Sequence, residues 1–161
     1  MRRKQLFMKL VAAGFFGLIL AHHSIAQVHA VAVVVNPKNP TTNLSLGDLR
    51  KVFAGEKRTW PGGLPVKIMV RGPGTRERLA LLRILEMSES EYKQYWAAQV
   101  FRGEADAEPM VLPSFGMTKE AMSLFPGAIA LVDIQDFKAG MEIKIIKVEG
   151  HMPGEAGYPN F

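Results

Sequence analysis

The stretch from Val66 to Arg78 reads VKIMVRGPGTRER and carries the strongest indication of the fold class. Its first half alternates apolar side chains with others, which is the pattern of a β-strand. The residues Gly-Pro-Gly-Thr at 72–75 predict a tight loop, and Thr75 stands where the N-cap of a helix belongs. A helix is expected from Arg76 to about Met87. A strand that passes through a short loop into a helix is the unit from which α/β sheets are built.

Similar patterns on both sides of this unit predict further strands and helices. The apolar run VAVVV at 31–35 is typical of a strand that is covered on both faces. A helix begins after Ser45 and ends at Gly55, where we expect a positive φ. The S-x-x-E capping box at Ser88 begins a helix that ends at Gly103, and an exposed acidic connection follows to residue 113. The remaining expected elements are a helix at 118–125, a strand at 128–132, a helical turn at 133–138 and a strand at 143–148. This order predicts an open α/β sandwich.

The apolar faces of these elements identify expected core residues. They are Leu49, Phe53, Trp60, Tyr92, Tyr95, Trp96 and Val100.

The N-terminus has the three parts of an export signal. Residues 1–9 are basic, residues 10–21 form an uncharged apolar run, and small residues favour cleavage after Ala26 or Ala30. An uncleaved anchor is the alternative, although the apolar run is short for a membrane span. The expected organisation is a signal peptide at 1–26, an α/β domain at 27–149 and a loose tail at 150–161. The mature protein would be periplasmic or secreted, without stable insertion in the membrane.

Composition argues against several classes of function. The formal net charge is +5, but four basic residues lie in positions 1–9, and the other 16 basic residues nearly balance 15 acidic ones. Binding of nucleic acid through many phosphate contacts is therefore not expected. The chain has no cysteine, and its histidines lie in the leader or the tail. We accordingly expect no metal site, no cofactor and no enzymatic activity.

The loop after the expected strand at 66–70 is the best candidate for a ligand site. Arg71 lies at the carboxyl edge of the sheet, and Gly72 and Gly74 allow close approach of the backbone. The first N–H groups of the next helix attract anions, and arginines supply forked donors for an oxyanion. A turn that merely caps the helix is the alternative. The candidate anion-binding residues are Arg71, Gly72, Gly74, Thr75, Arg76, Arg78 and Ser114, the last of which equally fits an ordinary helix cap.

Four segments resemble the phosphate-binding proteins of ABC transporters. LSLGDLRKVFAG at 44–55, followed by Trp60, is similar to the family's L-S-L-x-x-L-x-x-I-F-x-G pattern and its later T-W. VVVNPKNP at 33–40 resembles the strand and Asn-Pro loop that open a lobe. Arg71 with Gly74-Thr75 resembles the Arg…Ser-Gly-Thr phosphate loop, with Pro73 in place of the serine. PGAIALV at 126–132 resembles the strand P-G-A-I-G-Y-V.

The resemblance implies one lobe of a type II periplasmic-binding-protein-like fold that binds phosphate or a similar oxyanion without catalysis. Arg71 would neutralise charge, Gly74 and Thr75 would donate hydrogen bonds, and Arg76 or Arg78 would add a second cation. The implied partners are inorganic phosphate, an ABC permease, and a second lobe or a second copy of the chain. The alternative function is a ligand-free interaction or scaffold module of the cell envelope.

Overall fold

The computed structural model describes residues 30–138 and 140–161. The expected signal peptide lies outside these residues. Within them, no helix is both long enough and apolar enough to cross a membrane.

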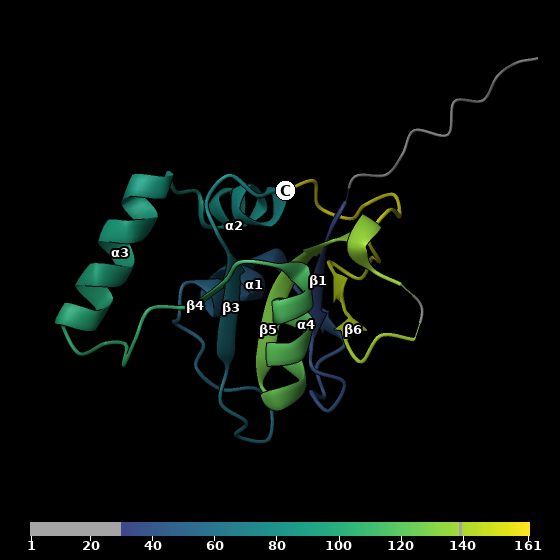
Figure 1. Ribbon diagram of the computed structural model, residues 1–161, viewed down its shortest axis with the longest axis horizontal. Coiled ribbons are helices and arrows are strands. Elements are labelled where there is room, and N and C mark those ends of the chain that lie inside the picture. Colours follow the sequence, from purple (N-terminus) through teal and green to yellow (C-terminus); the bar gives the residue numbers. More distant parts are fainter. Residues whose placement is uncertain (1–29, 139) are drawn as a thin grey trace, which may run out of the picture.

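A five-stranded mixed sheet in the order β4-β3-β5-β1-β6 forms the centre of the molecule (Figure 1). Its strands are β1 Val31–Val35, β3 Lys67–Arg71, β4 Met110–Leu112, β5 Ala128–Asp133 and β6 Lys144–Ile145. β3 runs parallel to β4 and β5, whereas β1 is antiparallel to β5 and β6. A separate parallel pair joins β2 (Asn43–Leu44) to β7 (Lys147–Val148). The three parallel strands therefore end at the same edge of the sheet.

Helices cover both faces of this sheet, as an open α/β sandwich requires. They are α1 Leu46–Phe53, α2 Arg76–Leu85, α3 Glu89–Phe101, α4 Phe115–Leu124 and the short 3₁₀-helix η1 Ile134–Asp136. In Figure 1, α4 lies in front of the sheet, α1 and α2 lie behind it, and α3 extends past β4. Val33 and Val35 of β1 belong to one core cluster, and Ala32 and Val34 belong to the other. Burial on both faces explains why this strand is a continuous apolar run.

Local chemistry at the helix ends agrees with the sequence. Ser45 accepts a hydrogen bond from the backbone of its own helix, and Ser88 and Glu91 form the expected capping box. Gly55 has φ +73°, and a Cβ there would lie 2.7 Å from the Trp96 ring. The glycine is thus required both by its left-handed conformation and by the close approach of the indole.

The expected core is confirmed for most of its members. Leu49 and Phe53 are 0% and 1% exposed, and the buried Trp60 donates from its indole nitrogen to the Gly127 carbonyl at 2.9 Å. Tyr92 and Trp96 are buried and Tyr95 packs beside them. Val100 is the exception, because it is 38% exposed near the end of α3.

Three segments differ from what the sequence predicted. The connection at 103–113 contains β4, a strand of only three residues at the sheet edge. The strand expected at 143–148 is divided into β6 and β7, which pair with different partners. α4 begins at Phe115 and not at Thr118, because Ser114 caps it.

The C-terminal segment, expected to be loose, packs against the core instead. The Tyr158 hydroxyl donates to the Val31 carbonyl at 2.9 Å, and the Tyr158 and Phe161 rings meet edge to face with centroids 5.6 Å apart. Glycine and proline gave this segment its loop-like composition, but its two aromatic side chains anchor it.

Candidate functional site

The site is built where β3, β4 and β5 end. Arg71 is in register with Leu112, so the loop that follows β3 and the start of α4 lie at the same edge of the sheet. Asp133, the last residue of β5, lies there too. The structure thereby brings Ser114 to the same edge as Gly72 and Gly74, as open α/β sheets place their ligand-binding loops.

Thr75 caps α2 in the structure. Its hydroxyl donates to the Gly72 carbonyl at 2.9 Å and accepts from the Arg78 backbone N–H at 3.2 Å. Gly74 has φ +83°, a left-handed conformation that favours glycine. The two glycines and the threonine therefore form the tight turn that the sequence predicted, and the threonine hydroxyl already has partners within the chain.

Ser114 caps α4 in the same way. Its hydroxyl accepts from the Met117 backbone N–H at 3.2 Å. It lines a hollow together with Lys138 and Met141, away from the Arg71 side chain. Arg76 also points away, since its guanidinium lies 3.3 Å from the Asp133 carboxylate. Neither side chain belongs to the cavity described next.

Arg71 is a largely buried cation, and one carboxylate of the described residues lies close to it. Its side chain is 14% exposed, and its Nε lies 3.7 Å from Oε1 of Glu77, which is 7% exposed. This separation makes an ion pair but exceeds a hydrogen bond. The buried Nε and Nη1 atoms of Arg71 have no hydrogen-bond partner among the described residues.

Arg78 is more deeply buried and is held from two sides. Its Nε and Nη2 atoms both donate to the Glu89 carboxylate at 2.9 Å, and its guanidinium carbon lies 3.8 Å from the Tyr92 ring centroid. These hydrogen bonds hold the pKa of Glu89 below its usual value. The third nitrogen, Nη1, is buried without a hydrogen-bond partner in the described part of the chain.

Tyr92 adds a neutral donor to the two arginines. Burial raises the pKa of its phenol to about 12, so the hydroxyl keeps its proton at neutral pH. This hydroxyl, too, is buried; it lies beside the Arg78 guanidinium and makes no hydrogen bond of good geometry within residues 30–138 or 140–161.

These donors line a cavity of about 130 Å³ between the β3–α2 loop, β4 and α3. We call it the arginine cavity. Its lining residues are Arg71, Pro73, Arg78, Glu89, Tyr92, Lys93, Glu108, Pro109 and Val111. Buried polar groups in proteins are nearly always hydrogen-bonded, so the unpartnered donor atoms on three lining residues, Arg71, Arg78 and Tyr92, indicate a missing acceptor. An oxyanion or a group of waters has the acceptor atoms that this arrangement needs.

Sequence reasoning placed Arg71 and Arg78 at the site but missed Tyr92, Glu89 and Glu108. Tyr92 was assigned to the core because it lies on the apolar face of its helix, and its ring does pack there. Glu89 lies in the first turn of α3, and Glu108 lies in the connection that precedes β4. Only tertiary structure brings α3 and the chain before β4 against the β3–α2 loop.

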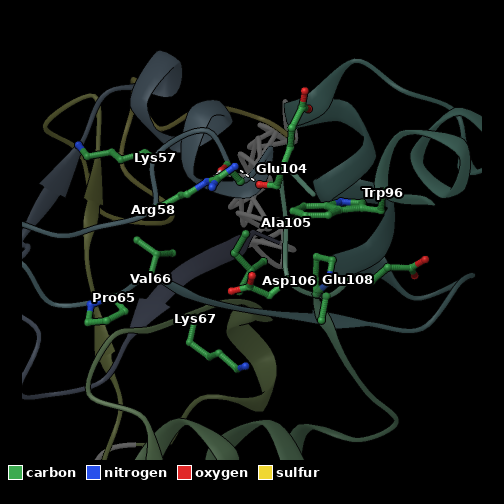
Figure 2. A pocket seen from close by; sticks show the side chains of 14 residues that line it. Lys57, Arg58, Pro65, Val66, Lys67, Trp96, Glu104, Ala105, Asp106 and Glu108 are labelled. Carbon is green, nitrogen blue, oxygen red and sulfur yellow. Dashed lines mark hydrogen bonds between the residues drawn. The ribbon is translucent and has the colours of Figure 1, made fainter. Parts of the chain in front are cut away.

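A larger groove of about 290 Å³ lies on the other side of the segment 104–109 (Figure 2). Glu108 and Pro109 line both the groove and the arginine cavity. Figure 2 shows the Glu108 side chain pointing away from Val66 and Lys67, whereas Asp106 points toward them. No group of three or more metal-binding side chains occurs in the described residues.

No protein-family model matches the sequence, and neither does any curated protein. The structure is similar to an ABC-type phosphate transport receptor from Vibrio cholerae, with a TM-score of 0.60 and 19% identity over 77% of this chain and 48% of that one. It is similar to a putative phosphate ABC transporter substrate-binding protein from Clostridium perfringens, solved with bound phosphate, with a TM-score of 0.60 and 16% identity over 77% and 46% of the two chains. PstS from Borrelia burgdorferi matches with a TM-score of 0.58 and 19% identity over 77% and 49%.

The chain thus spans about half the length of these proteins. At such low identity the likeness concerns the fold. The described residues adopt the fold of a single lobe of the substrate-binding proteins of phosphate ABC transporters.

Proposed function

We propose that this protein is an exported, non-catalytic binding protein for phosphate or a similar small oxyanion, and that the arginine cavity is its site. The observation that carries the proposal is the set of buried, unpartnered donors on Arg71, Arg78 and Tyr92. Arginine presents planar N–H groups that suit tetrahedral oxyanions, and a protonated phenol adds a donor without a charge. The fold neighbours, one of which was solved with phosphate, support this choice of ligand.

The charge balance of the site predicts weak binding. Each of the three arginines proposed for the site has a carboxylate partner: Glu77 for Arg71, Asp133 for Arg76 and Glu89 for Arg78. A bound anion would therefore be stabilised mainly by hydrogen bonds and only weakly by attraction to a net positive charge. Good charge-assisted hydrogen bonds contribute about 1.5–3 kcal/mol each, and association entropy offsets much of their sum. A net of about −4 kcal/mol corresponds to a dissociation constant of about 1 mM.

Glu108 gives the cavity a means of distinguishing oxyanions. It lines the cavity and forms no ion pair within the described residues. A carboxylate accepts hydrogen bonds and donates none. Monohydrogen phosphate carries a proton that Glu108 would accept, whereas sulfate at neutral pH carries none and would be repelled. We expect phosphate to bind more tightly than sulfate, because only the protonated anion can donate a hydrogen bond to the Glu108 carboxylate.

Isothermal titration calorimetry with inorganic phosphate tests the proposal. Arg71→Ala should weaken binding beyond detection, while the control Arg83→Ala should leave it unchanged, since Arg83 is an exposed arginine of α2 that does not line the cavity. Circular dichroism of each variant verifies that it is folded. If wild-type protein gives no heat at tens of millimolar phosphate, or if both variants weaken binding equally, the arginine cavity is not an anion site. The first result would favour the ligand-free interaction module.

A further inference from the structure

The groove of Figure 2 exists because β3 and β4 pair over only part of their length. β4 is in register with Met69–Arg71, and the chain before it, residues 104–109, diverges from the first half of β3. The resulting space of about 290 Å³ is more than twice the volume of the arginine cavity. Apolar side chains of Val66, Ile68, Ala105 and Trp96 contribute to its walls.

Most charged groups at the rim of this groove already have partners. Arg58 donates to the backbone carbonyls of Gly55 and Glu104. The Glu104 carboxylate is paired with Arg102 at 2.9 Å, and Figure 2 shows it pointing out of the groove. Lys57 lies 3.5 Å from the Asp48 carboxylate. These residues form the frame of the groove and leave little charge for a ligand.

Asp106, Glu108 and Lys67 line the groove without an ion pair in the described residues, and of the two acids Glu108 points away from Lys67 in Figure 2. Asp106 points into the groove from the 104–109 segment, and it forms no ion pair within the described residues. Lys67 lines it from β3, with its ammonium 5.6 Å from the centroid of the Phe125 ring. The two side chains do not form an ion pair with each other. An apolar space therefore lies beside two opposite charges that are not neutralised by ion pairing.

Trp96 forms a buried wall of the groove. Its side chain lines the groove, the residue is only 3% exposed, and its indole N–H has no hydrogen-bond partner in the described part of the chain. The indole nitrogen is itself buried, so Trp96 contributes an apolar ring surface to the groove.

We propose that this groove binds a small zwitterion, specifically an α-amino acid with an apolar side chain. The ligand's ammonium group pairs with the Asp106 carboxylate, and its carboxylate pairs with the Lys67 ammonium. Its apolar side chain packs against Val66 and Ile68. This site is separate from the arginine cavity and does not depend on the proposed binding of oxyanions.

The test is an NMR titration of the ¹⁵N-labelled protein with L-leucine. We expect saturable shift changes at residues 66–68 and 104–107. Two probes each lack one charge: leucinamide has no carboxylate and 4-methylpentanoate has no ammonium. Each should bind at least about tenfold more weakly than leucine, because it loses a charge-assisted hydrogen bond. Asp106→Asn and Lys67→Gln should weaken leucine binding by a similar factor, and since both residues are exposed they should remain folded.

Two control variants separate this site from the oxyanion site. Glu104→Gln removes an exposed carboxylate of the same segment that points out of the groove, and it should bind leucine like wild type. Arg71→Ala should also keep leucine binding, even though it loses phosphate. The proposal is overturned if leucine produces no saturable shifts at the groove residues. It is equally overturned if the Asp106 and Lys67 variants both bind leucine as tightly as wild type.

Discussion

Replacing Arg71 by methionine should expose how strongly the site depends on its buried ion pair. Glu77 is 7% exposed and lies in the first turn of α2, where the helix dipole favours a negative charge. The Nε–Oε1 distance of 3.7 Å gives an attraction of about 4–5 kcal/mol at an effective dielectric constant of about 20. Arg71→Met leaves the Glu77 carboxylate buried without its partner, and losing one member of a buried pair costs about 3–5 kcal/mol.

A double-mutant cycle measured by urea unfolding tests this reasoning. Arg71→Met should lower the free energy of unfolding by about 3–5 kcal/mol, whereas the double variant Arg71→Met/Glu77→Met should recover more than half of that loss. The exposed Arg83→Met on the same helix should change stability by no more than about 0.5 kcal/mol. Strictly additive losses, with a coupling energy below about 0.5 kcal/mol, would show that the two charges are solvated and that our account of the site's electrostatics is wrong.

Three further predictions concern the core, the acid limit of stability and export. Leu49→Ala should lower the free energy of unfolding by about 2–5 kcal/mol, because Leu49 is 0% exposed; a loss below about 0.5 kcal/mol would contradict its place in the core. Arg78 lowers the pKa of Glu89 from its ordinary 4.5, so the stabilisation from this pair is present above pH 4.5 and is lost as the pH falls through the depressed pKa. In unfolding curves measured from pH 6 to 3, the free energy of unfolding of Glu89→Gln should therefore fall less steeply with pH than that of wild type. N-terminal sequencing of protein from the cell envelope should find cleavage after residue 26 and not after Ala30. The reason is that the Ala30 carbonyl accepts a hydrogen bond from the Ile134 backbone N–H at 3.0 Å, which cleavage after Ala30 would remove. An intact leader would show that the segment is an anchor.

The sequence predicted the main units of the fold because their signals are local. The run 31–35, the cap at Ser45, the glycine stop at position 55 and the capping box at Ser88 each depend on residues within a few positions. β4 was missed because a three-residue edge strand with acidic residues before it has too little pattern to be distinguished from a loop. Its pairing with β3 is a tertiary contact.

The site could be predicted only in part for the same reason. Arg71 and the Gly-Pro-Gly-Thr turn were visible because one strand and one helix flank them. The hydroxyl of Thr75, expected as a ligand donor, already has partners inside the turn. The donors without partners on Arg78 and Tyr92 come from two helices, and which of their atoms are hydrogen-bonded is determined by packing. No spacing of residues in the sequence predicts which donor atoms remain without a hydrogen-bond partner.

A crystal structure of the protein grown with millimolar to tens of millimolar phosphate would show whether the arginine cavity holds an oxyanion. We expect a tetrahedral anion in the arginine cavity, within about 3 Å of Nη1 of Arg71 and Nη1 of Arg78, with the Tyr92 hydroxyl donating to it. An anion bound only outside the β3–α2 loop, with waters occupying the arginine cavity, would contradict the claim.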